Sequence, residues 1–162
     1  MAFEISQAQI IRDYIIDEGL MSLPSNETDW PLYIGSLPDI DGDCGCIYNI
    51  SGRLDGRLSD GTVISHRGIS IHIRADDNYD DGYNKMESIA IYLELAHNDT
   101  VVIDGITYQI VNITRQGNII PAVEGGGALT LQEILQRGGG ESSNTKRRFL
   151  FELRFLTTIN RL

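Results

Sequence analysis

The chain has 162 residues, of which 41% are hydrophobic and 22% are charged. This length fits one domain that buries about 70% of its unfolded surface around a single core, and the apolar content argues against wholesale disorder. There are 23 acidic residues against 13 Lys and Arg, which gives a net charge of −10. That balance argues against a broad nucleic-acid-binding face, because such a face is basic.

The charge is unevenly distributed along the chain. Eight carboxylates and no Lys or Arg lie between Asp13 and Gly52, whereas six basic and two acidic residues lie between Arg137 and Leu162. An acidic face and a basic strand or arm would suit this asymmetry, and the two can meet in neighbouring subunits.

Membrane and secretion signals are absent from the sequence pattern. No apolar run approaches the ~20 residues that cross a bilayer, and the N-terminal residues lack the basic region and apolar core of a signal peptide. We therefore expect a protein made and used in a cytoplasm, with no membrane partner. Cys44 and Cys46 are one residue apart, which is poor geometry for a disulfide and too few ligands for zinc, so free thiols are expected.

The N-terminal segment predicts a helix. Ser6 is the expected N-cap, the helix runs to about Glu18, and Gly19 stops it. Ile11, Tyr14 and Ile15 would share its buried face.

Short strands follow this helix. A short edge strand is predicted over LYIG at 32–35, a second strand over 47–50, and a third over 68–75. The glycine-rich stretch GRLDGRLSDGT at 52–62 predicts a mobile hairpin tip or a long loop.

The second half begins with a helix predicted over 83–97, where apolar residues recur every three or four positions. A hairpin follows, with Asp104 and Gly105 at its turn. Order is harder to support after Gln116, and a flexible Gly-rich arm is expected at about 122–145.

The chain closes on an alternating strand, RRFLFELRFLTTIN, with Phe149, Phe151, Leu153 and Phe155 pointing inward. These elements predict an α+β fold in one domain over 1–162. We expect a largely antiparallel, mixed sheet of about five to six strands with two main helices on one face.

Candidate chemistry is sparse. The acidic turn at 39–45 invites a calcium site, but Cys44 and Ile50 occupy positions where an EF-hand loop needs Gly and Glu, so a solvated turn is preferred. The acidic residues at 76–81 have no nucleophile or base beside them, and they suit a solvated loop that caps the next helix. The three histidines have no partner at ligand spacing and are expected to be structural or exposed. We expect no enzyme, no metal site and no cofactor.

Four stretches carry a family resemblance. They are WPLYIGSLPDIDGDCGCIYNISG, GISIHIRADDNYDDGYNKMESI, VVIDGITYQIVNITRQGNIIPAVE and the closing strand. In the second, a strand ends in Arg, a loop carries a Tyr, and a helix opens on another Tyr. With the first helix these stretches cover nearly the whole chain. They resemble the tail terminator, or minor tail-completion, proteins of long-tailed bacteriophages. The chain departs from that pattern in its glycine-rich insertion at 124–145.

The resemblance implies a structural virion protein that breaks no bond. Such proteins form a hexameric ring that caps the tail tube, ends its elongation and joins the tail to the head or neck. The implied partners are other copies of the chain, the tail tube protein, a neck or head-completion protein, and genomic DNA that passes without sequence-specific binding. A head-completion or stopper protein of the neck is the main alternative. A cytoplasmic acidic binding module, with calcium at the acidic turn, is a third hypothesis.

The expected interface residues are charged or aromatic and lie in or beside the loops. The 76–81 loop would lie at one rim of the ring, where it either contacts a neighbour or faces the channel. The residues are Arg53, Arg57, Asp76, Asp77, Tyr79, Asp80, Asp81, Arg147 and Arg148.

Overall fold

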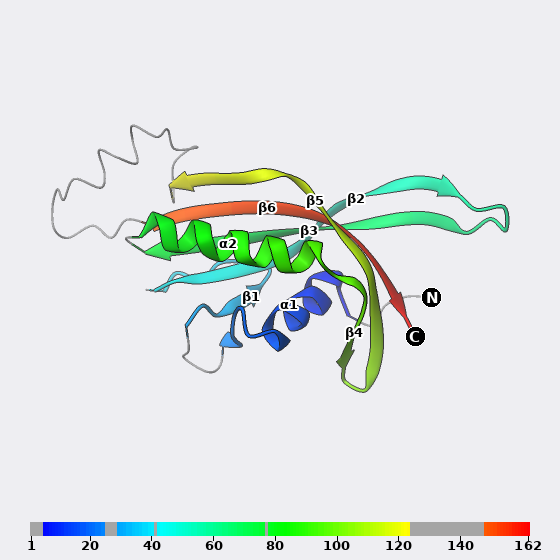
Figure 1. Cartoon of the computed structure of the whole chain (residues 1–162), viewed down its shortest axis with the longest axis horizontal. Helices are drawn as coiled ribbons and strands as arrows, with labels where there is room; N and C mark the ends of the chain where they lie inside the picture. Colours follow the sequence, from blue (N-terminus) through cyan, green and yellow to red (C-terminus); the bar gives the residue numbers. More distant parts are fainter. Residues whose placement is uncertain (1–4, 25–28, 41, 77, 124–147) are drawn as a thin grey trace, which may run out of the picture.

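The computed structural model of the chain describes residues 5–24, 29–40, 42–76, 78–123 and 148–162. Two helices and six strands lie within these ranges, in an order that Figure 1 shows. They are α1 (Gln7–Asp17), β1 (Leu32–Ile34), β2 (Cys44–Arg57), β3 (Val63–Asp76), α2 (Tyr79–Glu94), β4 (His97–Ile103), β5 (Ile106–Val123) and β6 (Arg148–Arg161).

The strands form one mixed sheet in the order β1-β2-β3-β6-β5-β4. β1 pairs with β2 in parallel, and the other four strand pairings between these elements are antiparallel. The predicted α+β class is therefore confirmed, and β1 lies at an edge of the sheet as expected.

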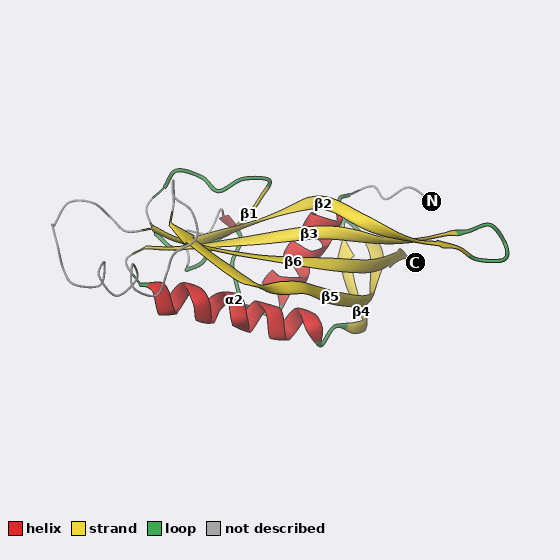
Figure 2. Cartoon of the chain, turned by 90° about the horizontal axis from the view of Figure 1, so that it is seen from above, coloured by secondary structure: helices red, strands yellow, loops and turns green. Residues whose placement is uncertain are grey.

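Both helices pack on the same face of the sheet (Figure 2). β3 and β6 alternate, so that Ile71 and Ile73 of β3 and Phe151 and Phe155 of β6 are fully buried beneath the helices. The two helices also touch, since the rings of Tyr14 and Tyr92 stack at 4.8 Å. The predicted single helix-covered face and the inward alternation of β6 are confirmed.

The first helix has the predicted boundaries. The Ser6 hydroxyl accepts a hydrogen bond from the backbone N–H of Gln9 at 3.2 Å, and Glu18 is the C-cap. Gly19 follows at φ +79°, a conformation that favours glycine and ends the helix. Ile11, Tyr14 and Ile15 are buried as expected.

The predicted bounds of the second helix, 83–97, are wrong at both ends. α2 begins at Tyr79 because the Asn78 side chain accepts a hydrogen bond from the backbone N–H of Asp81 at 3.2 Å and caps the helix there. α2 ends at Glu94, and His97 opens β4 instead of closing the helix. Apolar periodicity marks the buried stripe of a helix, and a polar cap lies outside that stripe.

The strands predicted at 47–50 and 68–75 are much longer than expected. β2 and β3 pair from Cys44↔Arg74 out to Arg57↔Val63, so most of the predicted 52–62 loop is paired strand and the turn occupies only 58–62. The hairpin-tip interpretation is confirmed and the long-loop interpretation is wrong. Figures 1 and 2 show this part of the hairpin extending well beyond the rest of the sheet. We call residues 52–67 the distal hairpin.

A β-bulge marks the root of the distal hairpin. The register shifts between the pairs Ile50↔Gly68 and Arg53↔His66, where two residues of β2 face one residue of β3. A Cβ atom at Gly52 would lie 1.9 Å from the carbonyl oxygen of His66, so the strands approach too closely here for any side chain. The bulge therefore depends on glycine.

The predicted β4–β5 hairpin is confirmed. Asp104 and Gly105 form its turn with φ of 51° and 78°. β5 then continues to Val123, past an irregularity between Gln116 and Ile120. The first two residues of the predicted arm at 122–145 are thus the end of β5, and the rest of that arm lies outside the described residues.

Candidate assembly interface

The predicted acidic turn is held by a buried arginine. Arg74, near the end of β3, is 1% exposed, and its guanidinium donates to the carbonyl oxygens of Pro38 at 2.8 Å and Ile40 at 2.6 Å. The planar fork of five N–H donors suits two carbonyl groups in one turn. We call this contact the arginine clasp.

Carboxylates complete the clasp. The Asp76 side chain accepts from the backbone N–H of Gly42 at 2.7 Å, and the backbone N–H of Asp76 donates to Asp43 at 2.8 Å. Burial, together with the nearby Asp76 charge, raises the pKa of Asp43 even though the backbone hydrogen bond opposes the shift. Arg148 reaches Asp39 at 3.0 Å and Asp76 at 3.8 Å.

This geometry gives the acidic turn a structural role. Among its described carboxylates, Asp43 accepts a hydrogen bond from the backbone N–H of Asp76, and Asp39 pairs with Arg148. Within the described ranges, no group of three His, Cys, Asp or Glu residues is placed to hold a metal ion. The two cysteines beside the turn, Cys44 and Cys46, are buried and free.

The predicted loop at 76–81 is mostly not a loop. Asp76 ends β3, and Tyr79, Asp80 and Asp81 form the first turn of α2. The carboxylates of Asp80 and Asp81 are exposed at the helix N-terminus, where negative charge stabilises the helix. Tyr79 instead packs inward, with its ring 4.9 Å from that of Phe151 and 5.6 Å from that of Phe149.

The histidines have local partners, in line with the structural or exposed roles expected for them. His72 lies 2.7 Å from the Tyr48 hydroxyl and 3.7 Å from Glu152. His97 is exposed and lies 3.2 Å from the Asn98 side chain.

A chain of polar contacts stiffens one side of the distal hairpin. Arg53 pairs with Asp55 at 2.7 Å, and Asp55 lies 2.7 Å from the ring of His66. The other ring nitrogen of His66 lies 2.8 Å from the Thr158 hydroxyl on β6. The hydrogen bond from Arg53 is the main cause that lowers the pKa of Asp55, so this carboxylate is charged at neutral pH.

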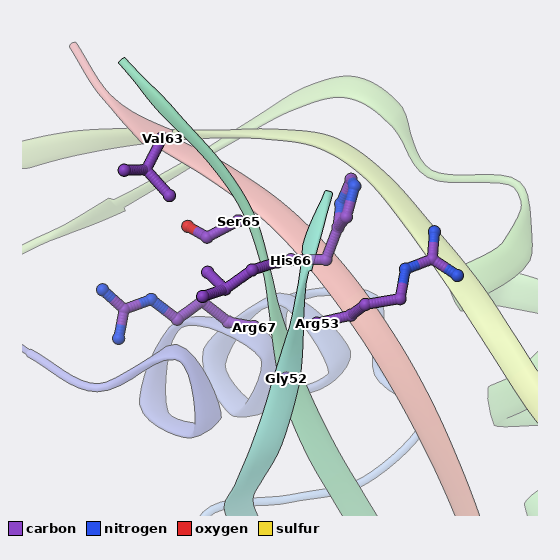
Figure 3. A pocket seen from close by; sticks show the side chains of 7 residues that line it. Gly52, Arg53, Val63, Ser65, His66 and Arg67 are labelled. Atoms are coloured by element: carbon purple, nitrogen blue, oxygen red, sulfur yellow. The ribbon is translucent and has the colours of Figure 1, made fainter. Parts of the chain in front are cut away.

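The other side of the distal hairpin is apolar and basic. In Figure 3, Val63, Ser65 and Arg67 project to one side of the strands, and Arg53 and His66 project to the other. Cross-strand pairing places Leu54 with Ser65 and Arg57 with Val63 on that first side. An open pocket of about 340 Å³ lies at the root of the hairpin, between Gly52, Leu54 and Arg67.

The expected interface residues therefore separate into two groups at opposite ends of the molecule (Figure 1). Arg53 and Arg57 belong to the distal hairpin, whereas Asp76 and Arg148 form part of the clasp, and Tyr79, Asp80 and Asp81 begin α2. Asp77 and Arg147 lie outside the described residues. The sequence analysis did not assign interface or anchoring roles to Leu54, Arg67 and Arg74, because the apolar alternation of β3 is clear only from Ile69 to Ile73 and gives no signal at 63–67.

The comparison with known families bears on the whole arrangement. The profile of the family described as "Bacteriophage tail terminator protein" matches residues 14–130, which is more than half of the chain. The chain belongs to the phage tail terminator family. The match includes the distal hairpin and α2, and β6 lies beyond it. A search of the curated proteins found no match.

Membership of the tail terminator family confirms the resemblance drawn from the sequence. It makes the chain a structural component of a phage virion that acts with other tail proteins. Within the described residues, no helix is long and apolar enough to cross a membrane.

Proposed function

We propose that this tail terminator forms a hexameric ring that caps the phage tail tube, ends its elongation and joins the tail to the head or neck. Family membership supports a structural role in the tail. What we propose beyond it is the hexameric ring, the capping of the tail tube and the joining of the tail to the head or neck. The work is done by binding alone, so no catalytic group or cofactor is required.

The observation that carries the proposal is the distal hairpin. It extends away from the body and exposes Leu54, Leu58 and Val63 by 72%, 52% and 42%. Exposed apolar side chains on a protruding element mark a protein-binding surface. The strands β1 and β4 also present the two edges of the described sheet, and sheet edges pair readily with neighbouring chains.

The proposed partners follow from a ring at the tail–neck junction. They are other copies of this chain, the tail tube protein and a neck or head-completion protein. Genomic DNA would pass through the channel without sequence-specific contacts. The net charge of −10 supports this last point, because an acidic wall repels DNA. We propose Asp76, Asp80, Asp81 and Arg148 as residues of one rim, and chain 1–162 as a single tail-terminator-like domain.

The test is to measure the native mass over a range of concentrations and to image the protein with purified tail tubes by negative stain. A six-fold ring with a central hole, seated at one end of a tube of fixed length, is the expected result. A twelve-fold ring that ignores tube ends would instead indicate a connector of the neck. Tubes that keep growing in the presence of the protein would overturn the proposed function.

A further inference from the structure

The distal hairpin continues the core face of the sheet beyond the helices that cover it. Val63, Ser65 and Arg67 share the side of β3 that Ile69, Ile71 and Ile73 present to the core. The three isoleucines are fully buried, whereas Val63, Ser65 and Arg67 are exposed. In the described part of the chain, no helix lies over this extension (Figures 1 and 2).

The uncovered side has a specific chemistry. Leu54 and Val63 supply apolar surface, and Arg57 and Arg67 supply positive charge at its two ends. The Arg57 guanidinium donates to the Gly61 carbonyl at 3.1 Å, which holds it near the tip. A partner for this surface therefore needs an apolar stripe with carboxylates beside it.

The outer surface of α2 has that composition. Tyr83, Ile91 and Leu95 are exposed by 39%, 54% and 75% and follow one another at helical spacing. We call them, with the exposed Glu94, the α2 stripe; Glu87 lies among them but is already paired with Arg115 at 3.7 Å. α2 contains four carboxylates and one lysine, and that lysine, Lys85, is turned to the Leu20 carbonyl at 2.9 Å and to the Trp30 ring.

The two surfaces are also similar in length. The hairpin arm from Gly52 to Leu58 spans about 23 Å at ~3.3 Å per residue. The α2 stripe, from Tyr83 to Leu95, spans about 20 Å at ~1.5 Å per residue. The hairpin projects away from α2 of its own chain (Figure 1), so the two surfaces do not meet within one chain.

We propose that the Leu54–Val63 side of the distal hairpin docks on the α2 stripe of the next copy. Each chain then gives one surface and receives the other, which is the heterologous contact that closes a ring. Arg57 and Arg67 face the carboxylates of α2, and Leu54 and Val63 cover Ile91 and Leu95. This contact rests on the proposed ring and names the surfaces that build it.

Cysteine cross-linking between two differently labelled copies tests the contact. Leu54→Cys chains are mixed with Ile91→Cys chains, assembled on tail tubes and treated with a short bis-maleimide. The native Cys44 and Cys46 are buried, and burial is the main cause that raises both pKa values, that of Cys46 to about 12, so they stay unreactive. Leu54→Cys with Arg154→Cys is the matched control, because Arg154 is exposed on the central strand β6, between the buried Leu153 and Phe155, and so lies on the face of the sheet opposite the helices.

The expected result is a dimer band from the Leu54→Cys and Ile91→Cys mixture and none from the control. Rings that form while Leu54→Cys links only to the tube protein, or to neither partner, would overturn the contact and leave the ring intact. A chain that forms no oligomer with or without tubes would overturn both proposals.

A charge variant tests the same contact in a second way. Arg67→Gln is expected to raise the concentration for half-assembly about two- to fivefold per interface. Arg154→Gln removes an equal charge from the exposed outer face of β6, away from the hairpin, and should leave assembly unchanged. Equal effects of the two variants would contradict the assigned face.

Discussion

Arg74 is a charged residue that the fold buries because two carbonyl groups of one turn receive it. Its guanidinium holds Pro38 and Ile40, and Asp76 and Arg148 bind the same turn from either side. The sequence analysis considered this turn as a possible calcium site, whereas in the structure the Arg74 guanidinium binds it. Single residues of this kind set the shape of one end of the molecule.

Arg74→Lys is expected to destabilise the fold by about 1.5–3 kcal/mol, the range for a hydrogen bond to a charged group. A lysine ammonium lacks the planar fork that serves both carbonyls at once. Urea unfolding measures the loss. Arg154→Lys is the control, because Arg154 is exposed and its pair with Glu152 is screened by solvent. Equal losses in the two variants would show that the clasp has no special role.

Gly82 allows α2 to lie close to the sheet. A Cβ atom there would lie 2.5 Å from the Phe151 ring and 2.7 Å from the Ala75 side chain. Gly82→Ala is therefore expected to cost about 1–3 kcal/mol through overpacking, although alanine favours a helix by about 1 kcal/mol. Asn84→Ala, on the exposed side of α2, is the control in the same unfolding experiment. A Gly82→Ala protein more stable than the parent would refute the close packing.

His72 predicts a pH dependence of stability. Burial is the largest cause of its shift and lowers its pKa below the ordinary 6.5, although the Glu152 carboxylate opposes the change. Between the folded and unfolded pKa values the unfolded chain binds more protons, so stability falls as pH drops through 6.5. Unfolding measured from pH 8 to 5.5 should show this loss in the parent and a smaller loss in His72→Gln. Parallel curves would rule out His72 as the cause.

At the scale of elements, the sheet has a covered part and an uncovered part. The α1 and α2 layer buries the alternating residues of β3 and β6. Beyond the bulge, residues 53–66 of the distal hairpin have ladder partners only in the hairpin itself. A two-stranded ribbon without a packed layer is marginally stable in water. The contacts among Arg53, Asp55, His66 and Thr158 secure its root.

Hydrogen exchange is expected to show this difference directly. Backbone amides of Leu54 to Arg57 should exchange much faster in the free chain than those of Ile69 to Ile73, because the former open without unfolding the core. Assembly on tail tubes should slow exchange in the hairpin and leave the β3 core unchanged. Equal protection of the two segments in the free chain would contradict a marginally stable ribbon that opens independently of the core.

At the scale of the whole molecule, an acidic protein with a basic apolar projection is suited to ordered self-association. The two ends of the long axis carry different chemistry: the distal hairpin at one, and the clasp with the start of α2 at the other. A ring built from such a subunit has distinct contact surfaces and two different rims.

Charge reversal at Asp80 and Asp81 separates two roles for the acidic start of α2. Slower DNA delivery by intact rings would place these carboxylates at the channel, and lost rings would place them at a subunit contact. Both carboxylates also stabilise the helix N-terminus by about 0.3–1 kcal/mol each. The Asp80→Asn and Asp81→Asn double variant, which removes charge without reversing it, controls for that loss. Unchanged rings and unchanged delivery would remove both roles.

The sequence by itself determined the elements whose signals are local. Ser6 and Gly19 bound α1, Asp104 and Gly105 form the turn of the β4–β5 hairpin, and the alternation of Phe149 to Phe155 assigns the core face of β6. Each depends on neighbours within a few positions, where capping, turn conformation and side-chain direction are fixed by backbone geometry. The chain-wide resemblance to tail terminators rests on the same local patterns.

Only the tertiary structure decided what distant residues do together. Glycine-rich residues at 52–57 became strand because β3 lies alongside to pair with them, and the acidic turn became an anchor because Arg74 is 34 residues away in the chain and adjacent in space. The glycine-rich composition had suggested a loop at 52–57, and the acidic composition had suggested a solvated turn at 39–45. Hydrogen bonds between strands and burial of charge depend on partners that local sequence does not specify.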